Sequence, residues 1–229
     1  AISRGYHSFA IAMPADFTIG KLQPLTEFED LVRDAMIGFG FEEAFCNVLT
    51  SLEQLQQRMG IGVGQQGAPP FHGGQVVRIG NIMNRNYACL RDWILPSLLE
   101  IAAHSLGASY PHRLFEVGEV AVYDPSQNIG SRTESRVGAV IASDEATFDS
   151  AQSVVYALLA SLKIPFRVQP WAHPSFIEGR VGLILDSRGA PLGFLGELSP
   201  QVLTAWGVRT PIAAFELGLH ALYELDRMV

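Results

Sequence analysis

The feature that most constrains the fold is the way in which the predicted strands follow one another. Apolar, strand-forming runs occur in adjacent pairs joined by short polar turns, and not only between helices. The clearest pairs are 113–124 with 136–143, and the two arms of 179–198 on either side of the turn 186–191. Strands joined in this way are antiparallel, because a parallel connection needs a long crossover. We therefore predict an α+β fold with a mainly antiparallel sheet flanked by helices.

The helices are predicted from apolar residues at three- and four-residue spacing. The first starts at a capping box of Thr26 and Glu29 and ends at Gly38 and Gly40. Further helices are expected over 92–109, with Asp92 as a candidate cap, and over 145–164. The first helix carries a continuous apolar face, made of Phe28, Leu31, Val32, Ala35, Met36 and Phe39. We expect this face to be an interface, because so apolar a stripe is unfavourable in water.

Composition excludes some classes of function. The 229 residues are 48% hydrophobic and carry a net charge of −7, so we expect one large core and no autonomous binding to nucleic acid, which needs a basic surface. No apolar run approaches the roughly 20 residues that span a bilayer, and no signal peptide opens the sequence, so a cytoplasmic location is expected. Since the sequence starts with Ala1 in what reads as the middle of a strand, we expect a piece of a longer polypeptide. Residues 1–20 would then be a lead-in segment and 21–229 the folded module.

Two local patterns suggest chemistry but favour structural interpretations. Cys46 and Cys89 lie far apart in apolar surroundings, which favours reduced core residues over a disulfide or a metal site. Gly62, Gly64 and Gly67 match a GxGxxG pattern. Here, however, a helix precedes the glycines and prolines follow, whereas a phosphate-binding loop follows a strand and opens a helix. A flexible loop is therefore favoured over a nucleotide site.

Carboxylates are spread over several predicted strands, at Glu116, Glu119, Glu178, Glu197 and Glu216. Carboxylates in strands of a core usually have a basic or backbone partner, so we predict structural roles for them. Arg113 and Arg180 are the arginines that we expect to form internal ion pairs.

Several stretches in a fixed order resemble one known family. They are ISRGYHSF (2–9), RIGNIMNRNYACLRDWILPSLL (78–99), YPHRLFEVGEV (110–120), HPSFIEGRVG (173–182), GFLGELSPQVLTAWGV (193–208) and PIAAFELGL (211–219). Together they resemble the C-terminal, catalytic-like module of the phenylalanyl-tRNA synthetase β subunit, in its archaeal and eukaryotic version. The resemblance covers nearly the whole chain.

The resemblance implies an α₂β₂ enzyme in which the α subunit carries ATP, magnesium and the chemistry, while this module repeats the class II synthetase fold without the catalytic groups. In an active subunit, an Arg-x-Glu pair on one strand reaches one face of the sheet. Here Arg113 and Glu116 are three residues apart, so in a regular strand they point to opposite faces. The third family motif should end in an arginine near the phosphates, where this chain has Gly218 and His220. We therefore interpret these four residues as relics of catalytic motifs.

The sequence thus predicts a non-catalytic structural module that uses its first helix to pack in a helical bundle with the α subunit. No catalytic, ligand-binding or metal-binding residue is predicted in this chain, which would contact tRNA only through the assembled enzyme and no membrane. An isolated module could self-associate. Two alternatives stay open: a stand-alone paralogue that binds an amino acid or acts as a regulator, and a self-sufficient ATP-dependent ligase.

Overall fold

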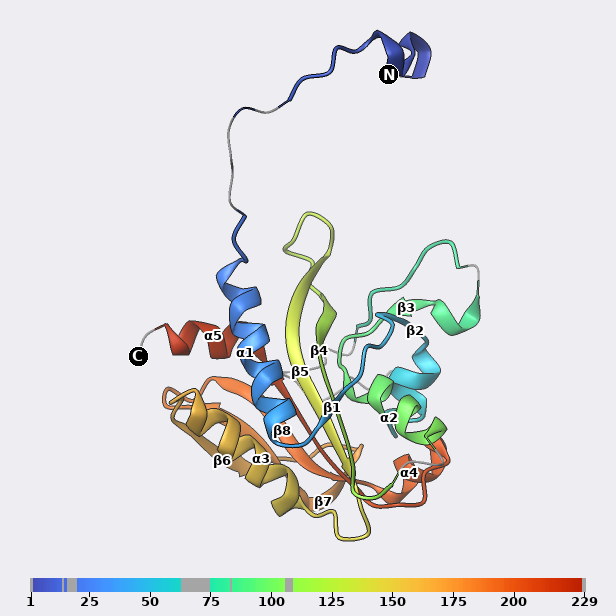
Figure 1. Cartoon of the computed structure of the whole chain (residues 1–229). Helices are drawn as coiled ribbons and strands as arrows, with labels where there is room; N and C mark the ends of the chain where they lie inside the picture. Colours follow the sequence, from blue (N-terminus) through green and yellow to red (C-terminus); the bar gives the residue numbers. More distant parts are fainter. Residues whose placement is uncertain are drawn as a thin grey trace.

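Most of the strands form one broad mixed sheet in the computed structural model, which describes residues 2–13, 15, 20–62, 75–82, 84–105 and 109–227. Within these residues a seven-stranded sheet has the order β1-β4-β5-β9-β8-β7-β6 (Figure 1). Its strands are β1 (Glu42–Glu43), β4 (His112–Tyr123), β5 (Ser131–Ala142), β6 (Phe166–Pro170), β7 (Phe176–Asp186), β8 (Pro191–Leu198) and β9 (Ile212–Gly218). Neighbouring strands are antiparallel, except that β1 runs parallel to β4. The predicted α+β fold with a mainly antiparallel sheet is confirmed.

The second long hairpin follows its predicted turn, whereas in the first hairpin β5 begins at Ser131, five residues before the predicted start of the strand at 136. In the first, β4 and β5 pair without a register shift from His112 opposite Ala142 to Tyr123 opposite Ser131. In the second, β7 and β8 are joined through Gly189, whose φ of 86° is one that glycine adopts without steric cost. These local signals were sufficient because a hairpin is built from residues that are close in the sequence.

Helices cover both faces of the sheet (Figure 1). The first face carries α1 (Pro24–Gly38), α3 (Phe148–Ser161) and α5 (Leu219–Asp226). The opposite face carries α2 (Leu95–His104), α4 (Pro200–Trp206) and the short π-helix η3 (Glu53–Gln57). Each face of the sheet buries an extensive apolar cluster against its helices, and this burial is the main stabilising contribution.

Two predicted helix starts are wrong. α1 begins at Pro24 with Gln23 as its N-cap, and not at Thr26, because proline fixes φ near its helical value and tolerates the first turn. α2 begins at Leu95, and the side chain of Asp92 does not cap it. The predicted end of α1 at Gly38 and Gly40 is confirmed, and Gly40 has a φ of 79°.

The region 41–51, which reads as one strand, is divided. Glu42 and Glu43 join the large sheet as β1, while β2 (Leu49–Thr50) pairs with β3 (Cys89–Leu90) in a separate small sheet. Short 3-10 helices lie at η1 (Ile2–Arg4), η2 (Tyr6–Ser8) and η4 (Arg85–Tyr87).

The first residues of the described chain extend away from the sheet (Figure 1). All of residues 2–13 except Gly5 are exposed, and Figure 1 draws them away from the sheet. Of the predicted glycine loop, Gly64 and Gly67 lie outside the described residues, so the GxGxxG interpretation stays a prediction. Among the helices that the structure describes, none is both long enough and apolar enough to cross a bilayer.

Candidate functional site

The two relic residues of β4 point to opposite faces of the sheet, as their spacing predicts. Arg113 lies on the α1 and α3 side, where it lines a hollow with Phe39 and Ile141. Glu116 lies on the α2 side and binds Arg91. The pairing of β4 with β5 is regular through both positions, so period-two alternation alone separates the two side chains. Arg113 and Glu116 therefore cannot bind the same ligand.

A buried ion pair neutralises Glu116. Arg91 Nη1 and Nη2 donate to the two carboxylate oxygens of Glu116 at 3.0 and 2.7 Å, and Arg91 Nε donates to the carbonyl oxygen of Glu119 at 3.0 Å. The Arg91 and Glu116 side chains are 1% and 2% exposed. A two-pronged contact of this kind is the strongest that a guanidinium makes with a carboxylate. The charge of Arg91 is therefore already satisfied by the protein.

A second buried arginine on the same face is satisfied in a similar way. Arg136 Nη1 donates to Glu216 Oε1 and to the carbonyl oxygen of Asp92, both at 3.1 Å. Its Nε and Nη2 donate to Glu134 Oε2 at 3.2 and 2.8 Å. The other carboxylate oxygen of Glu216 accepts from the backbone N–H groups of Ile94 and Leu95 at 2.8 and 3.3 Å. Glu216 thus joins β9, β5 and the N-terminus of α2, where a negative charge is favourable.

Burial also affects the side chain of Asp92, whose backbone carbonyl oxygen accepts a hydrogen bond from Arg136. Asp92 is 5% exposed, and its Oδ1 atom has no hydrogen-bond partner. Burial raises the pKa of Asp92 from 3.8 to about 7, against the opposing effect of the Arg136 charge. A carboxyl group in this position is protonated over much of the acidic range, so it does not supply a permanent negative charge.

Aromatic rings fill the space beside these ion pairs. His173 lies 5.1 Å from Trp171, 5.6 Å from Phe176 and 5.9 Å from Trp93, measured between ring centroids. Phe194 contacts three of the same rings. Burial lowers the pKa of His173 to about 4, so its ring is neutral at pH 7. This part of the face is therefore a packed core and lacks the polar, open character of a nucleotide site.

The relic residues of the third motif lie at the junction of β9 and α5. Gly218 is the last residue of β9 and the N-cap of α5, and His220 is exposed. His220 Nδ1 accepts a hydrogen bond from the backbone N–H of Ser135 at 3.3 Å. Both residues line a hollow of about 340 Å³ that also contains Arg132. Arg132 is paired with Asp124 and Glu134, so the guanidinium there is already occupied.

Arg113 is in a different state from the other two arginines of the site. Its Nη1 donates to the carbonyl oxygen of Phe39 at 3.1 Å, and its guanidinium carbon lies 5.9 Å from the centre of the Phe41 ring. Its Nε is buried without a hydrogen-bond partner. Among the described residues no carboxylate forms an ion pair with it, so the predicted internal pair of Arg113 is wrong. Arg180 does form an ion pair, because its Nη1 lies 2.7 Å from Glu197 Oε2, but its side chain is 59% exposed, so the pair is at the surface and not internal.

Comparison with known proteins decides the family. Residues 10–219 match the family described as the CLM domain of the phenylalanyl tRNA synthetase beta chain. The chain belongs to this family. The resemblance inferred from the sequence is thereby confirmed, and it covers most of the chain.

Individual relatives agree with this assignment. The chain is 34% identical over 224 residues to the phenylalanine–tRNA ligase beta subunit of Thermococcus gammatolerans, covering 97% of this chain and 39% of the relative. It is also 34% identical to the beta subunits of Pyrococcus abyssi, over 223 residues, and Borrelia recurrentis, over 221 residues. In these two comparisons 97% and 96% of this chain are covered, against 38% and 37% of the relatives. The chain therefore spans about two fifths of the length of these relatives.

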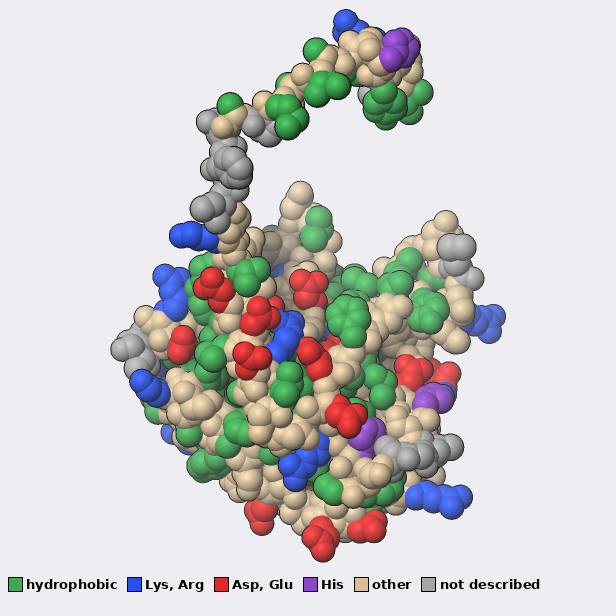
Figure 2. Space-filling model, in the orientation of Figure 1, with side chains coloured by type: hydrophobic (Ala, Val, Ile, Leu, Met, Phe, Trp, Pro, Cys, Tyr) green, Lys and Arg blue, Asp and Glu red, His purple; other side chains and the backbone are tan. Residues whose placement is uncertain are grey.

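Most of the predicted interface face of α1 already packs against other parts of the same chain. Phe28, Val32 and Met36 are buried against the sheet and its neighbouring helices, and Ala35 and Phe39 are half-buried. Leu31 is 52% exposed. Figure 2 shows acidic side chains over the outer side of α1 with basic side chains among them. A partner that contacts α1 must therefore meet Leu31 and this charged side, and the interface stays a prediction.

Both cysteines are free; Cys89 is buried, as expected for a core residue, whereas Cys46 is half-buried. Burial raises the pKa of the Cys89 thiol to about 11, and burial together with Glu116 raises the pKa of Cys46. Within the described part of the chain, no three His, Cys, Asp or Glu side chains are grouped so that they could hold a metal ion.

The sequence analysis did not predict the two arginines of the buried ion pairs, Arg91 and Arg136. Arg91 stands in a run that is otherwise mostly apolar, and Arg136 lies at the start of such a run, directly after a polar stretch. That position was the available signal, since an arginine that cannot reach solvent must have a carboxylate partner. Which carboxylate it takes depends on the sheet order and could not be read from the local sequence.

Proposed function

We propose that this chain is a non-catalytic structural module of the phenylalanine–tRNA ligase β subunit. In this proposal it packs against the catalytic α subunit of an α₂β₂ enzyme that charges tRNA with phenylalanine in the cytoplasm. ATP and magnesium are bound by the α subunit, and tRNA reaches this module only through the assembled enzyme. The names of the relatives, which are beta subunits of this ligase, support the proposal.

The observation that carries the proposal is the state of the two buried arginines on the α2 face. Arg91 is neutralised by Glu116, and Arg136 is neutralised by Glu216 and Glu134. A nucleotide triphosphate is bound by cations that are free to contact phosphate oxygens. Binding it here would require breaking buried ion pairs, which costs about 3–5 kcal/mol for each pair. The arrangement of these ion pairs therefore favours a structural role for the chain over a catalytic one.

The topology supports the finer proposal of a class II synthetase-like fold. The six strands from β4 to β6 pair antiparallel, and β1 is added in parallel beside β4 directly after the long helix α1. A long helix that leads directly into an edge strand is the arrangement that the resemblance to class II synthetases implies for the region after residue 27. On this proposal the sheet was retained because the hydrophobic clusters on its two faces depend on it.

Calorimetry with this chain tests the absence of catalysis. Titration with ATP and magnesium should release no binding heat, and titration with phenylalanine should release none. Heat of tight ATP binding would reject the scaffold proposal in favour of a self-sufficient ligase. Heat with phenylalanine alone would favour an amino-acid-binding paralogue or regulator. The α subunit of the same organism, titrated in the same buffer, provides the positive control.

Association tests the structural role. Sedimentation velocity of this chain mixed with the α subunit should show a complex that neither protein forms alone. If the two proteins sediment independently at micromolar concentrations, the proposed packing against α is rejected. Sedimentation of the chain by itself measures self-association in the same experiment.

A further inference from the structure

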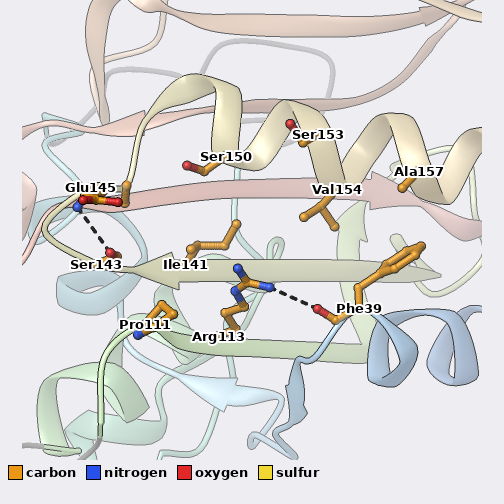
Figure 3. A pocket seen from close by; sticks show the side chains of 11 residues that line it. Phe39, Pro111, Arg113, Ile141, Ser143, Glu145, Ser150, Ser153, Val154 and Ala157 are labelled. Atoms are coloured by element: carbon orange, nitrogen blue, oxygen red, sulfur yellow. Dashed lines mark hydrogen bonds between the residues drawn. The ribbon is translucent and has the colours of Figure 1, made fainter.

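A hollow of about 500 Å³ lies on the α1 and α3 face, away from the arginine pairs of the α2 face. Its floor is formed by Arg113 and Ile141 from β4 and β5, and its walls come from the chain after α1 and from one side of α3 (Figure 3). Figure 3 shows Arg113 rising from β4 toward the side of α3 that carries Val154. The hollow is therefore lined by both apolar and polar side chains, with one guanidinium at its base.

This guanidinium forms no ion pair with any described residue, although Glu145 lines the same hollow. Arg113 makes one hydrogen bond, to the carbonyl oxygen of Phe39, and among the described residues no carboxylate pairs with it. Arg91 and Arg136, by contrast, are each paired with carboxylates. Holding a half-buried cation without a counter-charge is unfavourable, so this arginine is suited to an anion that comes from outside.

The lining defines the anion. The walls include the apolar side chains of Phe39, Pro111 and Val154, and hydroxyl groups come from Ser143, Ser150 and Ser153. Among the described lining residues Arg113 is the one cation, and Glu145 adds a negative charge. A phosphate would need more positive charge than this. One carboxylate attached to an apolar group matches one guanidinium, apolar walls and hydroxyl donors.

From this geometry we propose that the Arg113 hollow receives an aspartate or glutamate side chain, flanked by an apolar residue, from the catalytic partner subunit. This inference rests on the proposed function, and it supplies a specific contact that the apolar face of α1 does not. The surface around the hollow supports a protein occupant. Ile37, two residues before Phe39, is 54% exposed, and Tyr110, next to Pro111, is 58% exposed. A protein segment can cover such side chains while its carboxylate contacts Arg113, which a small acid cannot do.

The test uses two substitutions on the exposed side of α3. Ala157 lines the hollow and is exposed, so Ala157→Trp fills the hollow without disturbing the core. Ala160 is also exposed on α3 but does not line the hollow, so Ala160→Trp is the matched control. In sedimentation with the α subunit, Ala157→Trp should raise Kd by about tenfold or more, the size expected when a charge-assisted contact is lost. Ala160→Trp should leave Kd unchanged.

The charge is tested at Arg113 itself. Arg113→Gln should raise Kd by about tenfold, and Arg113→Lys should lose less because it keeps the positive charge. Thermal melting of each variant checks that the fold is retained, and the Ala157 pair gives the answer even if the Arg113 variants unfold. Wild-type binding that neither Ala157→Trp nor Arg113→Gln weakens overturns the inference and leaves the proposed function intact. Failure of the wild-type chain to bind the α subunit overturns both.

Discussion

The carboxylate of Glu216 accepts a hydrogen bond of 2.8 Å from the backbone N–H of Ile94, which lies 122 residues earlier in the chain. Through this contact a side chain of β9 performs the capping function that no side chain of α2 itself provides. The same carboxylate binds Arg136 on β5 at 3.1 Å. The carboxylate of one fully buried residue thus joins a helix and two strands.

Replacing Glu216 by glutamine should therefore be severely destabilising. The amide is neutral, so it leaves Arg136 with less counter-charge and the first amides of α2 with a weaker acceptor. Removing one partner of a buried ion pair costs about 3–5 kcal/mol. We expect Glu216→Gln to lower the free energy of unfolding by about 3 kcal/mol, measured by urea denaturation.

Glu134→Gln is the matched control, because Glu134 binds the same arginine from a side chain that is 21% exposed. Water can replace part of this contact, so the expected loss is about 1 kcal/mol or less. A loss for Glu216→Gln no larger than that for Glu134→Gln would contradict the central role of Glu216.

Asp92 should give the chain a distinctive pH dependence. Its pKa is raised by burial to about 7 in the folded protein, from an ordinary 3.8. Between these values the folded state holds a proton that the unfolded state has lost, so this group lowers stability as pH rises, by up to about 1.4 kcal/mol per pH unit. Below pH 3.8 and above pH 7 its contribution is constant.

Asp92→Asn removes this titration. The variant should gain stability relative to the wild type as pH rises from about 4 to about 7, and should be the more stable protein at pH 8. Urea midpoints over this range measure the difference. Asp144→Asn, at an exposed position, controls for the loss of one carboxylate. A stability difference between Asp92→Asn and wild type that does not change with pH would refute this account.

The parts of the fold that follow from local sequence were predictable. The alternation in β4 separated Arg113 from Glu116, and the turn 186–191 defined the hairpin of β7 and β8. Both features depend on neighbouring residues and on the period of a strand. The family resemblance reached further, because it used the order of several motifs along the whole chain.

The parts that depend on distant residues were not predictable. The contact of Glu216 with Ile94 joins positions whose proximity requires the sheet order β5-β9 and the placement of α2 on one face. The division of the region 41–51 between two sheets has the same origin, since each half pairs with a different strand. Sequence patterns give an element its type, but the choice of partner is a property of the assembled fold.

The two thiols should react slowly in the folded chain. Thiolates are the reactive species, and burial raises the pKa of Cys89 to about 11 and raises that of Cys46. At pH 8 we expect little reaction of either residue with a disulfide reagent in buffer and rapid reaction of both in concentrated urea. Complete labelling of the native chain within the mixing time would show that these groups are more accessible than their burial indicates.

Gly118 on β4 lies against the pair of Arg91 and Glu116, so a side chain added there should disturb this pair. A Cβ atom there would lie 2.5 Å from Arg91 Nη2 and 2.7 Å from Glu116 Oε1. Relieving this contact must displace a buried ion pair, so Gly118→Ala should cost about 3 kcal/mol. Gly38→Ala is the control, because nothing lies within 4 Å of its added Cβ and alanine favours a helix by about 0.5–1 kcal/mol. If Gly118→Ala leaves the urea midpoint unchanged, Arg91 and Glu116 can repack freely and their pairing does not determine the structure of this face.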